Sequence, residues 1–355
     1  MKNNISIIFI VVLTLLCGCQ KESKPIKKIT LKKLYECDAT ALTDSLKTPS
    51  TSCLTSNGTV FLLIPSKTLL LEINRYGIIN KKIDLCNLQY GGLRSPSCIQ
   101  SYNNNIIISD ISSKLIIFYD KNLNVLKSVK LYGYPLKFRI VNDNIYYLAD
   151  EMNKVSQHEQ YYSYKIFRHN MITNVEKEMY KGETINILSL RKELNLNTPK
   201  TIDFCLSNNE KLYCVVNSYD NLCVERISDN AHRKVINDDK WVPIPYESVE
   251  RKKYISYLKS YILRSYPVEK IKIDYKLSIN SMTTDSYGNL WLVTASRKNE
   301  IPIRIYSNDY KSCCCFSIKG YSVAQLNLQS KYLLVSETNP FNYRAKFILY
   351  EYRLF

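Results

Sequence analysis

Glycine and histidine are scarce in this chain of 355 residues, which has 9 glycines and 3 histidines. The histidines are His158, His169 and His232, and none lies near another at the spacing of metal ligands. The sequence also lacks a phosphate-binding glycine loop and a dinucleotide-binding glycine fingerprint. We therefore expect no cofactor and no imidazole-based metal site.

Long apolar runs are also missing after the first residues, so no later segment is predicted to cross a membrane. The run from Ile5 to Leu16 follows a single positive charge at Lys2 and is too short to span a bilayer comfortably. The segment Leu16-Cys17-Gly18-Cys19 is similar to a bacterial lipobox. This similarity predicts a signal peptide over 1–18, a tether over 19–25 and acylation of the Cys19 thiol.

The lipobox places the protein in the cell envelope, anchored in a membrane by lipid, with the outer membrane as the expected location. The sequence does not determine whether the protein faces the periplasm or the outside. The alternative is an ordinary secretory leader with two incidental cysteines, because Cys17 is unusual at the middle position of a lipobox.

A net charge of +17 would suit a negatively charged partner. The basic residues are dispersed, however, and no run interleaves them with aromatic residues as RNA-binding modules do. Lys, Asn, Ile and Tyr are abundant together, which an A/T-rich genome produces without selection for binding. We expect no nucleic-acid partner.

A cassette of short apolar strands and Asn, Gly or Asp turns recurs at a spacing of about 40 residues, which is typical of propellers and solenoids. The second strand of each cassette is the most apolar. Six copies can be traced: Thr51–Leu85, Cys98–Leu131, Leu136–Tyr180, Thr201–Ile236, Leu277–Ile318 and Ser322–Tyr350. The pattern predicts one all-β domain over 26–355, a six-bladed β-propeller of four-stranded antiparallel blades.

The sixth copy lacks a fourth strand. The segment from Pro25 to Tyr35 has Ile29 and Leu31 at strand-like spacing and no partner nearby in sequence. A propeller must close its ring or leave exposed strand edges, so we predict that this segment completes the last blade. The alternative is that it is only a Lys-rich linker from the anchor.

Two insertions interrupt the repeat, at about 181–200 and 238–276. Within the second, Ile255, Leu258 and Ile262 have helical spacing, and Pro267 ends the pattern. This predicts a helix near 246–266, which either caps one mouth of the ring or packs on the blade surface. A seventh, degenerate blade in this region is the alternative to six.

Two segments carry a family resemblance. The loop Gly91–Ile99, followed by Asn105–Asp110, and the stretch Asp285-Ser286-Tyr287-Gly288-Asn289-Leu290-Trp291-Leu292 are similar to the blade signature of TolB-like and NHL-like propellers. With the lipobox, the chain resembles the six-bladed propeller lipoproteins common in Bacteroidota. The resemblance implies fold and envelope location rather than an activity. Copies three, four and six lack the turn glycine.

Ten cysteines remain after Cys17 and Cys19 are set aside, and we predict that most of them are free and buried. Cys53, Cys98 and Cys205 occupy comparable inner-strand positions in different blades, which places them too far apart to pair. One bridge among Cys205, Cys214 and Cys223 is conceivable. In Cys313-Cys314-Cys315 alternate side chains point to opposite faces, which disfavours a three-thiolate cluster.

The sequence thus predicts a monomeric ring that acts as a binding or scaffold module, with a glycan or another envelope protein as its partner. The alternative is an enzyme, a lyase or hydrolase of glycans or lactones that uses carboxylates at one mouth of the channel. A third possibility is docking onto a membrane complex. Gly320–Ala324 nearly matches a nucleophile elbow, but Ala324 and the flanking strands make Ser322 an ordinary blade residue.

Overall fold

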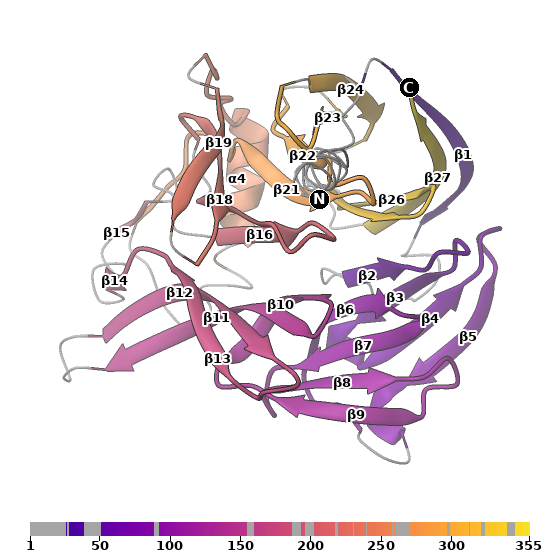
Figure 1. The fold of residues 1–355 in the computed structure, drawn as a ribbon. Coiled ribbons are helices and arrows are strands. Elements are labelled where there is room, and N and C mark those ends of the chain that lie inside the picture. Colours follow the sequence, from indigo (N-terminus) through magenta and orange to yellow (C-terminus); the bar gives the residue numbers. More distant parts are fainter. Residues whose placement is uncertain are drawn as a thin grey trace, which may run out of the picture.

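The computed structural model describes residues 26, 28–38, 51–88, 92–154, 160–186, 193–195, 202–216, 219–229, 231–238, 240–257, 259, 270–296, 299–311, 313–320, 324–338 and 345–355. The leader, Cys19 and the predicted tether lie outside these ranges. Six antiparallel sheets are arranged around a common axis (Figure 1). The chain is an all-β, six-bladed propeller, as the repeats predicted.

The first three blades follow one another along the chain. Blade one contains β2 (Thr51–Leu54), β3 (Val60–Ile64), β4 (Leu69–Ile73) and β5 (Ile79–Asp84). Blade two contains β6 (Pro96–Tyr102), β7 (Asn105–Asp110), β8 (Leu115–Tyr119) and β9 (Val125–Lys130). Blade three contains β10 (Tyr134–Val141), β11 (Asn144–Lys154), β12 (Gln160–Asn170) and β13 (Glu176–Lys181), with the short β14 (Ile185–Asn186) paired to β12. Helical turns η1 (Pro65–Lys67) and η2 (Leu85–Asn87) flank β4 and β5.

The remaining blades complete the ring. Blade four contains β16 (Ile202–Leu206), β17 (Leu212–Val216), β18 (Leu222–Ile227) and β19 (His232–Asp238). Blade five contains β21 (Ile279–Thr284), β22 (Leu290–Thr294), β23 (Glu300–Tyr306) and β24 (Cys313–Lys319). Blade six contains β25 (Ala324–Gln329), β26 (Tyr332–Thr338), β27 (Ala345–Leu354) and β1 (Ile29–Asp38).

The alternative of a seventh blade is wrong. Within its described part, the second insertion forms the helix α4 (Ser248–Tyr257) and the short strand β20 (Lys270–Lys272). β20 pairs in parallel with β15 (Glu193–Asn195) of the first insertion. The helix was predicted near 246–266; it begins at Ser248, and most of the chain beyond Tyr257 lies outside the described residues.

The polar stretch after Asp150 in the third copy forms part of a long hairpin. β11 and β12 keep one antiparallel register from the pair Asn144 and Asn170 to the pair Lys154 and Gln160. Continuous backbone pairing thus extends both strands.

The hydrophobic core lies between neighbouring blades. In β3, Val60, Leu62 and Ile64 contact blade six, whereas Phe61 and Leu63 contact blade two. Successive side chains of a strand point to opposite faces, so a second strand covered on both faces must be apolar throughout. This explains why the second strand of each cassette is the most apolar, while the outer strand β9 is largely exposed.

β1 closes the ring. It pairs antiparallel with β27, from Ile29 opposite Leu354 to Asp38 opposite Lys346. The register shifts between Lys33 and Tyr35, as at a β-bulge. The prediction of an N-terminal closing strand is therefore confirmed.

Apolar contacts and ion pairs hold this closing strand in place. Ile29 and Leu31 pack on the core between blades five and six, and Leu34 and Tyr35 pack on the core between blades six and one. The ammonium group of Lys346 in β27 lies 3.2 Å from the Glu36 carboxylate of β1. It also lies 2.8 Å from the carboxylate of Glu337 in β26, so a single cation joins three strands of blade six.

The blade signature of the fifth copy builds a tight turn between β21 and β22. The buried Asp285 carboxylate accepts hydrogen bonds from the backbone N–H groups of Tyr287 and Asn289, each at 2.9 Å. It also accepts from the Asn289 side-chain amide at 2.9 Å and the Trp291 indole at 3.1 Å. Gly288 has φ +80°, where an L side chain is strained. The signature is therefore structural.

All ten described cysteines are free thiols. Four are buried, namely Cys53, Cys98, Cys205 and Cys214, so the prediction that most are buried was wrong. Register also separates Cys205 from Cys214 in blade four. Phe204 lies opposite Cys214, so the neighbouring Cys205 points to the other face of the sheet.

We expect a chain that begins at residue 39 to lose its fold. Strand β27 of blade six would keep an unpaired edge, and the cores on both sides of blade six would lose the apolar contacts of β1. The loss of these side chains predicts a decrease of more than about 5 kcal/mol in the free energy of unfolding. Thermal and urea unfolding experiments measure this decrease in the free energy of unfolding. A chain that begins at residue 26 is the matched control, and a melting temperature within about 2 °C of that control would contradict this role of β1.

Candidate functional site

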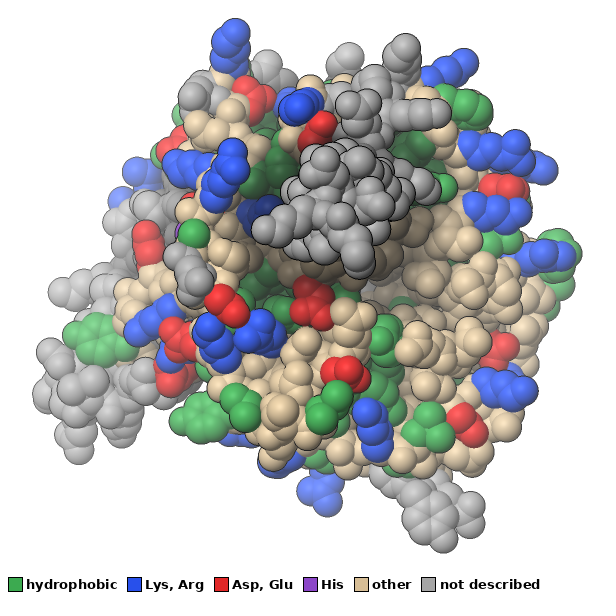
Figure 2. Space-filling view, viewed as in Figure 1, with side chains coloured by type: hydrophobic (Ala, Val, Ile, Leu, Met, Phe, Trp, Pro, Cys, Tyr) green, Lys and Arg blue, Asp and Glu red, His purple; other side chains and the backbone are tan. Residues whose placement is uncertain are grey.

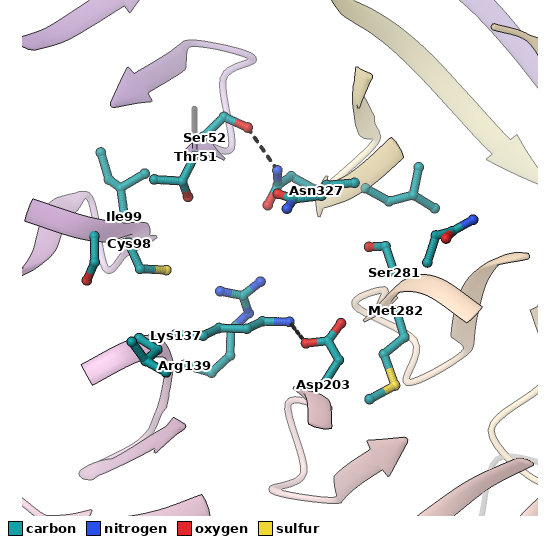
Figure 3. A pocket seen from close by; sticks show the side chains of 15 residues that line it. Thr51, Ser52, Cys98, Ile99, Lys137, Arg139, Asp203, Ser281, Met282 and Asn327 are labelled. Carbon is teal, nitrogen blue, oxygen red and sulfur yellow. Dashed lines mark hydrogen bonds and ion pairs between the residues drawn. The ribbon is translucent and has the colours of Figure 1, made fainter. Parts of the chain in front are cut away.

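A cavity of about 390 Å³ lies at the centre of the ring (Figure 3). The innermost strands of all six blades contribute to its wall. The lining residues are Thr51, Ser52, Ser97, Cys98, Ile99, Leu136, Lys137, Arg139, Asp203, Asn280, Ser281, Met282, Gln325, Leu326 and Asn327. This volume is within the range of small-molecule sites in proteins.

The cavity lies towards the face that carries both insertions. Apart from Arg139, its lining residues are among the first four of their strands. Because each blade is antiparallel and begins with its innermost strand, this end of the ring holds the connections from one blade to the next. The insertions at 181–200 and 238–276 are two of these connections.

The second insertion packs on the loops of blades four and five at this face. Lys276 lies 2.9 Å from Glu250 of α4 and donates to the Ser296 carbonyl at 3.1 Å. The rings of Tyr219 and Tyr275 stack at 5.1 Å between centroids. The described part of α4 contributes no residue to the cavity wall, so there it is a surface helix beside the mouth.

Of the described residues that line the cavity, three carry a charge. Lys137 of β10 and Asp203 of β16 form an ion pair that bridges blades three and four. Arg139 stands two residues after Lys137, on the same face of β10, and donates at 2.9 Å to the carbonyl of Phe138. Figure 3 shows the Lys137 side chain reaching across to Asp203. The three charges sum to a net positive charge.

Hydroxyl and amide groups form much of the remaining wall. Asn327 of β25 donates to the Ser52 hydroxyl of β2 at 3.1 Å, and Ser52 also lies 3.1 Å from the hydroxyl of Ser336. These contacts join blades six and one at the cavity. Ser281 and Gln325 add further polar groups to the wall.

Asp110, at the end of β7, fixes the start of the inner strand β6. Its carboxylate accepts from the backbone N–H groups of Arg94 at 2.7 Å, Ser95 at 3.0 Å and Ser113 at 3.0 Å. The Ser112 hydroxyl donates to it at 2.8 Å. Burial alone would raise the pKa of Asp110, but these hydrogen bonds outweigh burial and lower it to about 2.

The alternative predicted from the sequence is an enzyme that uses carboxylates at one mouth of the channel. Clustered carboxylates at a mouth would favour an enzyme. Among the described residues that line the cavity, Asp203 is the one carboxylate, and it is paired with Lys137. Among the described residues, no group of three or more His, Cys, Asp or Glu side chains could hold a metal ion. Ser322 lies outside these residues.

The sequence did not single out Lys137, Arg139 or Asp203. Of the inner-strand cysteines it did single out, Cys98 lines the cavity, and Cys53 and Cys205 are buried in β2 and β16. The sequence did contain a signal for this site, namely charged residues near the start of an innermost strand. Such side chains must face either the channel or a neighbouring blade. Only the strand register distinguishes these two faces.

No protein-family model matches the sequence, and no curated protein is similar to it. Solved structures resemble the fold. A protein of unknown function from Bacteroides thetaiotaomicron has a TM-score of 0.52 at 9% identity, over 92% of this chain and 76% of that chain. A member of the DUF4221 family from Bacteroides vulgatus has a TM-score of 0.48 at 11% identity, over 95% of this chain and 100% of that chain.

A virginiamycin B lyase from Staphylococcus aureus has a TM-score of 0.43 at 10% identity, over 91% of this chain and 99% of that chain. The similarity to the Bacteroides thetaiotaomicron structure agrees with the propeller fold. At these identities no comparison carries information about a reaction. Among the described residues, no helix is long and apolar enough to span a membrane.

The surface charge of the visible face is dispersed. Figure 2 shows Lys and Arg side chains scattered over the blades, with Asp and Glu between them. This agrees with the dispersed basic residues of the sequence.

Asp110 should make the fold sensitive to acid. Its pKa of about 2 in the folded protein is below the ordinary value of about 3.9 in an unfolded chain. The ionised Asp110 therefore contributes about 2 kcal/mol to the free energy of unfolding. This contribution is fully present above about pH 5 and is lost as the pH falls towards 2. Urea unfolding at several pH values should show a weaker acid dependence for Asp110→Asn than for the wild type. The control Asp143→Asn, at an exposed turn, should retain the wild-type dependence, and equal curves for all three proteins would contradict this role.

Proposed function

We propose that this protein is an exported, lipid-anchored binding module whose central cavity holds a small polar ligand. One observation carries the proposal: inner strands from all six blades converge on a cavity of about 390 Å³ with a largely polar wall. A ring packed on every flank is a rigid frame, so the polar groups of the wall keep fixed positions. Binding sites gain affinity when their groups are already in place.

The cavity chemistry supports binding more than catalysis. Its carboxylate, Asp203, is engaged by Lys137 and by the N–H of Phe204 at 2.8 Å. A general base must be free to reach a proton of the substrate. The cavity thus has polar groups that can orient a ligand, whereas its carboxylate is occupied.

The membrane anchor completes the proposal. Acylation of Cys19 would attach the ring to a membrane through the tether over 19–25, and two or more acyl chains make such attachment stable. β1 begins at Ile29, so only a few residues of the sequence separate the proposed tether from the closing strand. The TolB-like and NHL-like resemblance agrees with an envelope location and adds nothing about the ligand.

A cavity-filling variant tests the binding role. Gln325 lines the cavity and is exposed, so Gln325→Trp should fill the space without disturbing the core. Gln329→Trp is the matched control, because Gln329 is exposed on the same strand outside the cavity wall. Mass spectrometry of extracts from protein purified from its native cells should find a small molecule with the wild type and the control but not with Gln325→Trp.

The result could also contradict the binding role. Equal amounts of the small molecule with Gln325→Trp would place it elsewhere on the protein. Wild-type protein that carries no small molecule would count against a tightly held ligand. Circular dichroism and melting temperature check that both variants fold.

Labelling with a fatty-acid probe tests the anchor separately. Cys19→Ala should abolish incorporation of the probe and move the protein from the membrane pellet to the soluble fraction, because the accepting thiol is gone. Cys17→Ala removes the neighbouring thiol and should keep both the incorporation of the probe and the sedimentation with membranes. Unchanged labelling and sedimentation of Cys19→Ala would rule out the proposed lipid attachment.

A further inference from the structure

The cavity holds a cation that none of the described residues neutralises. The charges of Lys137 and Asp203 cancel within their ion pair. Arg139 forms no ion pair with the described residues, and the hydrogen bond it donates goes to the neutral carbonyl of Phe138. A guanidinium has five N–H donors, so most of the donors of Arg139 remain available to a ligand.

The neighbouring thiols do not supply the missing negative charge. The charge of Arg139 acts on the thiols of Cys53 and Cys205 and favours their ionised forms. Burial nevertheless raises the pKa of Cys205 to about 12 and raises the pKa of Cys53 still more strongly. Both thiols therefore stay protonated and neutral, and the half-buried guanidinium keeps its charge uncompensated.

The rest of the wall matches hydroxyl groups. Thr51, Ser52, Asn280, Ser281, Gln325 and Asn327 are neutral groups that can both donate and accept hydrogen bonds. An anion without hydroxyls would occupy Arg139 and leave these groups to water. A ligand with several hydroxyls would use both parts of the wall.

The volume limits the size of the ligand. About 390 Å³ corresponds to about 13 water molecules at about 30 Å³ each. A single acidic sugar has a comparable number of non-hydrogen atoms, so it fits whole. A longer glycan would place one residue in the cavity and extend towards the face that carries the two insertions.

We propose that the central cavity recognises a polyhydroxylated anion, an acidic sugar or sugar phosphate, whose carboxylate or phosphate pairs with Arg139 while its hydroxyls bind the Ser, Thr, Asn and Gln side chains of the wall. The inference rests on the proposed binding role of this cavity and adds the class of ligand. A planar guanidinium binds a carboxylate or phosphate through two parallel hydrogen bonds, which would make Arg139 the main determinant of specificity.

Calorimetric titration of the purified full-length protein with three probes tests this inference. The probes are glucuronate, glucose-6-phosphate and glucose, which share a ring and differ in the group on the last carbon. We expect at least one of the two acids to bind at least about tenfold more tightly than glucose, which corresponds to about 1.4 kcal/mol. Comparison of the two acids shows whether the site prefers a carboxylate or a phosphate.

Variants at position 139 assign this preference to the guanidinium. Arg139→Gln should weaken binding of the preferred acid about tenfold or more and leave glucose unchanged, while Arg139→Lys should retain part of the preference as a point charge. Arg75→Gln is the control, because Arg75 is a surface residue stacked on Tyr76. Arg139→Gln should melt no lower than the wild type, since the substitution breaks no ion pair with the described residues.

Three results would overturn the inference: acids and glucose that bind equally, acids that do not bind at millimolar concentration, or an Arg139→Gln variant with unchanged affinity for the acid. Its failure differs from failure of the proposed function. If Gln325→Trp loses the co-purified molecule but Arg139→Gln keeps it, the cavity is a binding site for another class of ligand. If Gln325→Trp keeps the molecule, both proposals fail.

Discussion

Apolar packing between neighbouring blades is the interaction on which the rest of this structure depends. Each second strand presents side chains to the blade before it and to the blade after it, as Leu62 and Leu63 do in β3. No blade can therefore bury its own apolar surface, and the free energy of burial is realised only in the assembled ring. This differs from a sandwich, in which two sheets bury one shared core.

The same geometry creates the cavity. Neighbouring inner strands are joined by side chains rather than by a continuous backbone ladder: Asn327 binds Ser52 between blades six and one, and Lys137 binds Asp203 between blades three and four. Polar residues at the starts of these strands thus have two roles, because they connect blades and line the space at the centre. Replacing Asn327 or Lys137, which make these contacts between blades, would change both the ring and the site.

Periodicity was sufficient to predict the fold, and even the closing strand followed from the missing fourth strand of the last copy. The cavity was harder to predict. Its key residues, Lys137, Arg139 and Asp203, come from three positions on two strands and belong to no local motif. They meet only because the ring brings β10 next to β16, and a register error of one residue would have turned them away. The Asp285 signature was easy to recognise because its hydrogen bonds are local, and for the same reason it reports a turn rather than a ligand.

Closure by β1 has a consequence for the order of assembly. β1 precedes every other strand of the ring, and its partner β27 is the last. β1 can therefore pair with β27 only after the chain of all the other blades has been made. Pairing of segments so far apart in the sequence is slow. The exposed lysines of β1, Lys32 and Lys33, would discourage pairing with the wrong chain in the meantime, since charge on an unpaired strand opposes aggregation.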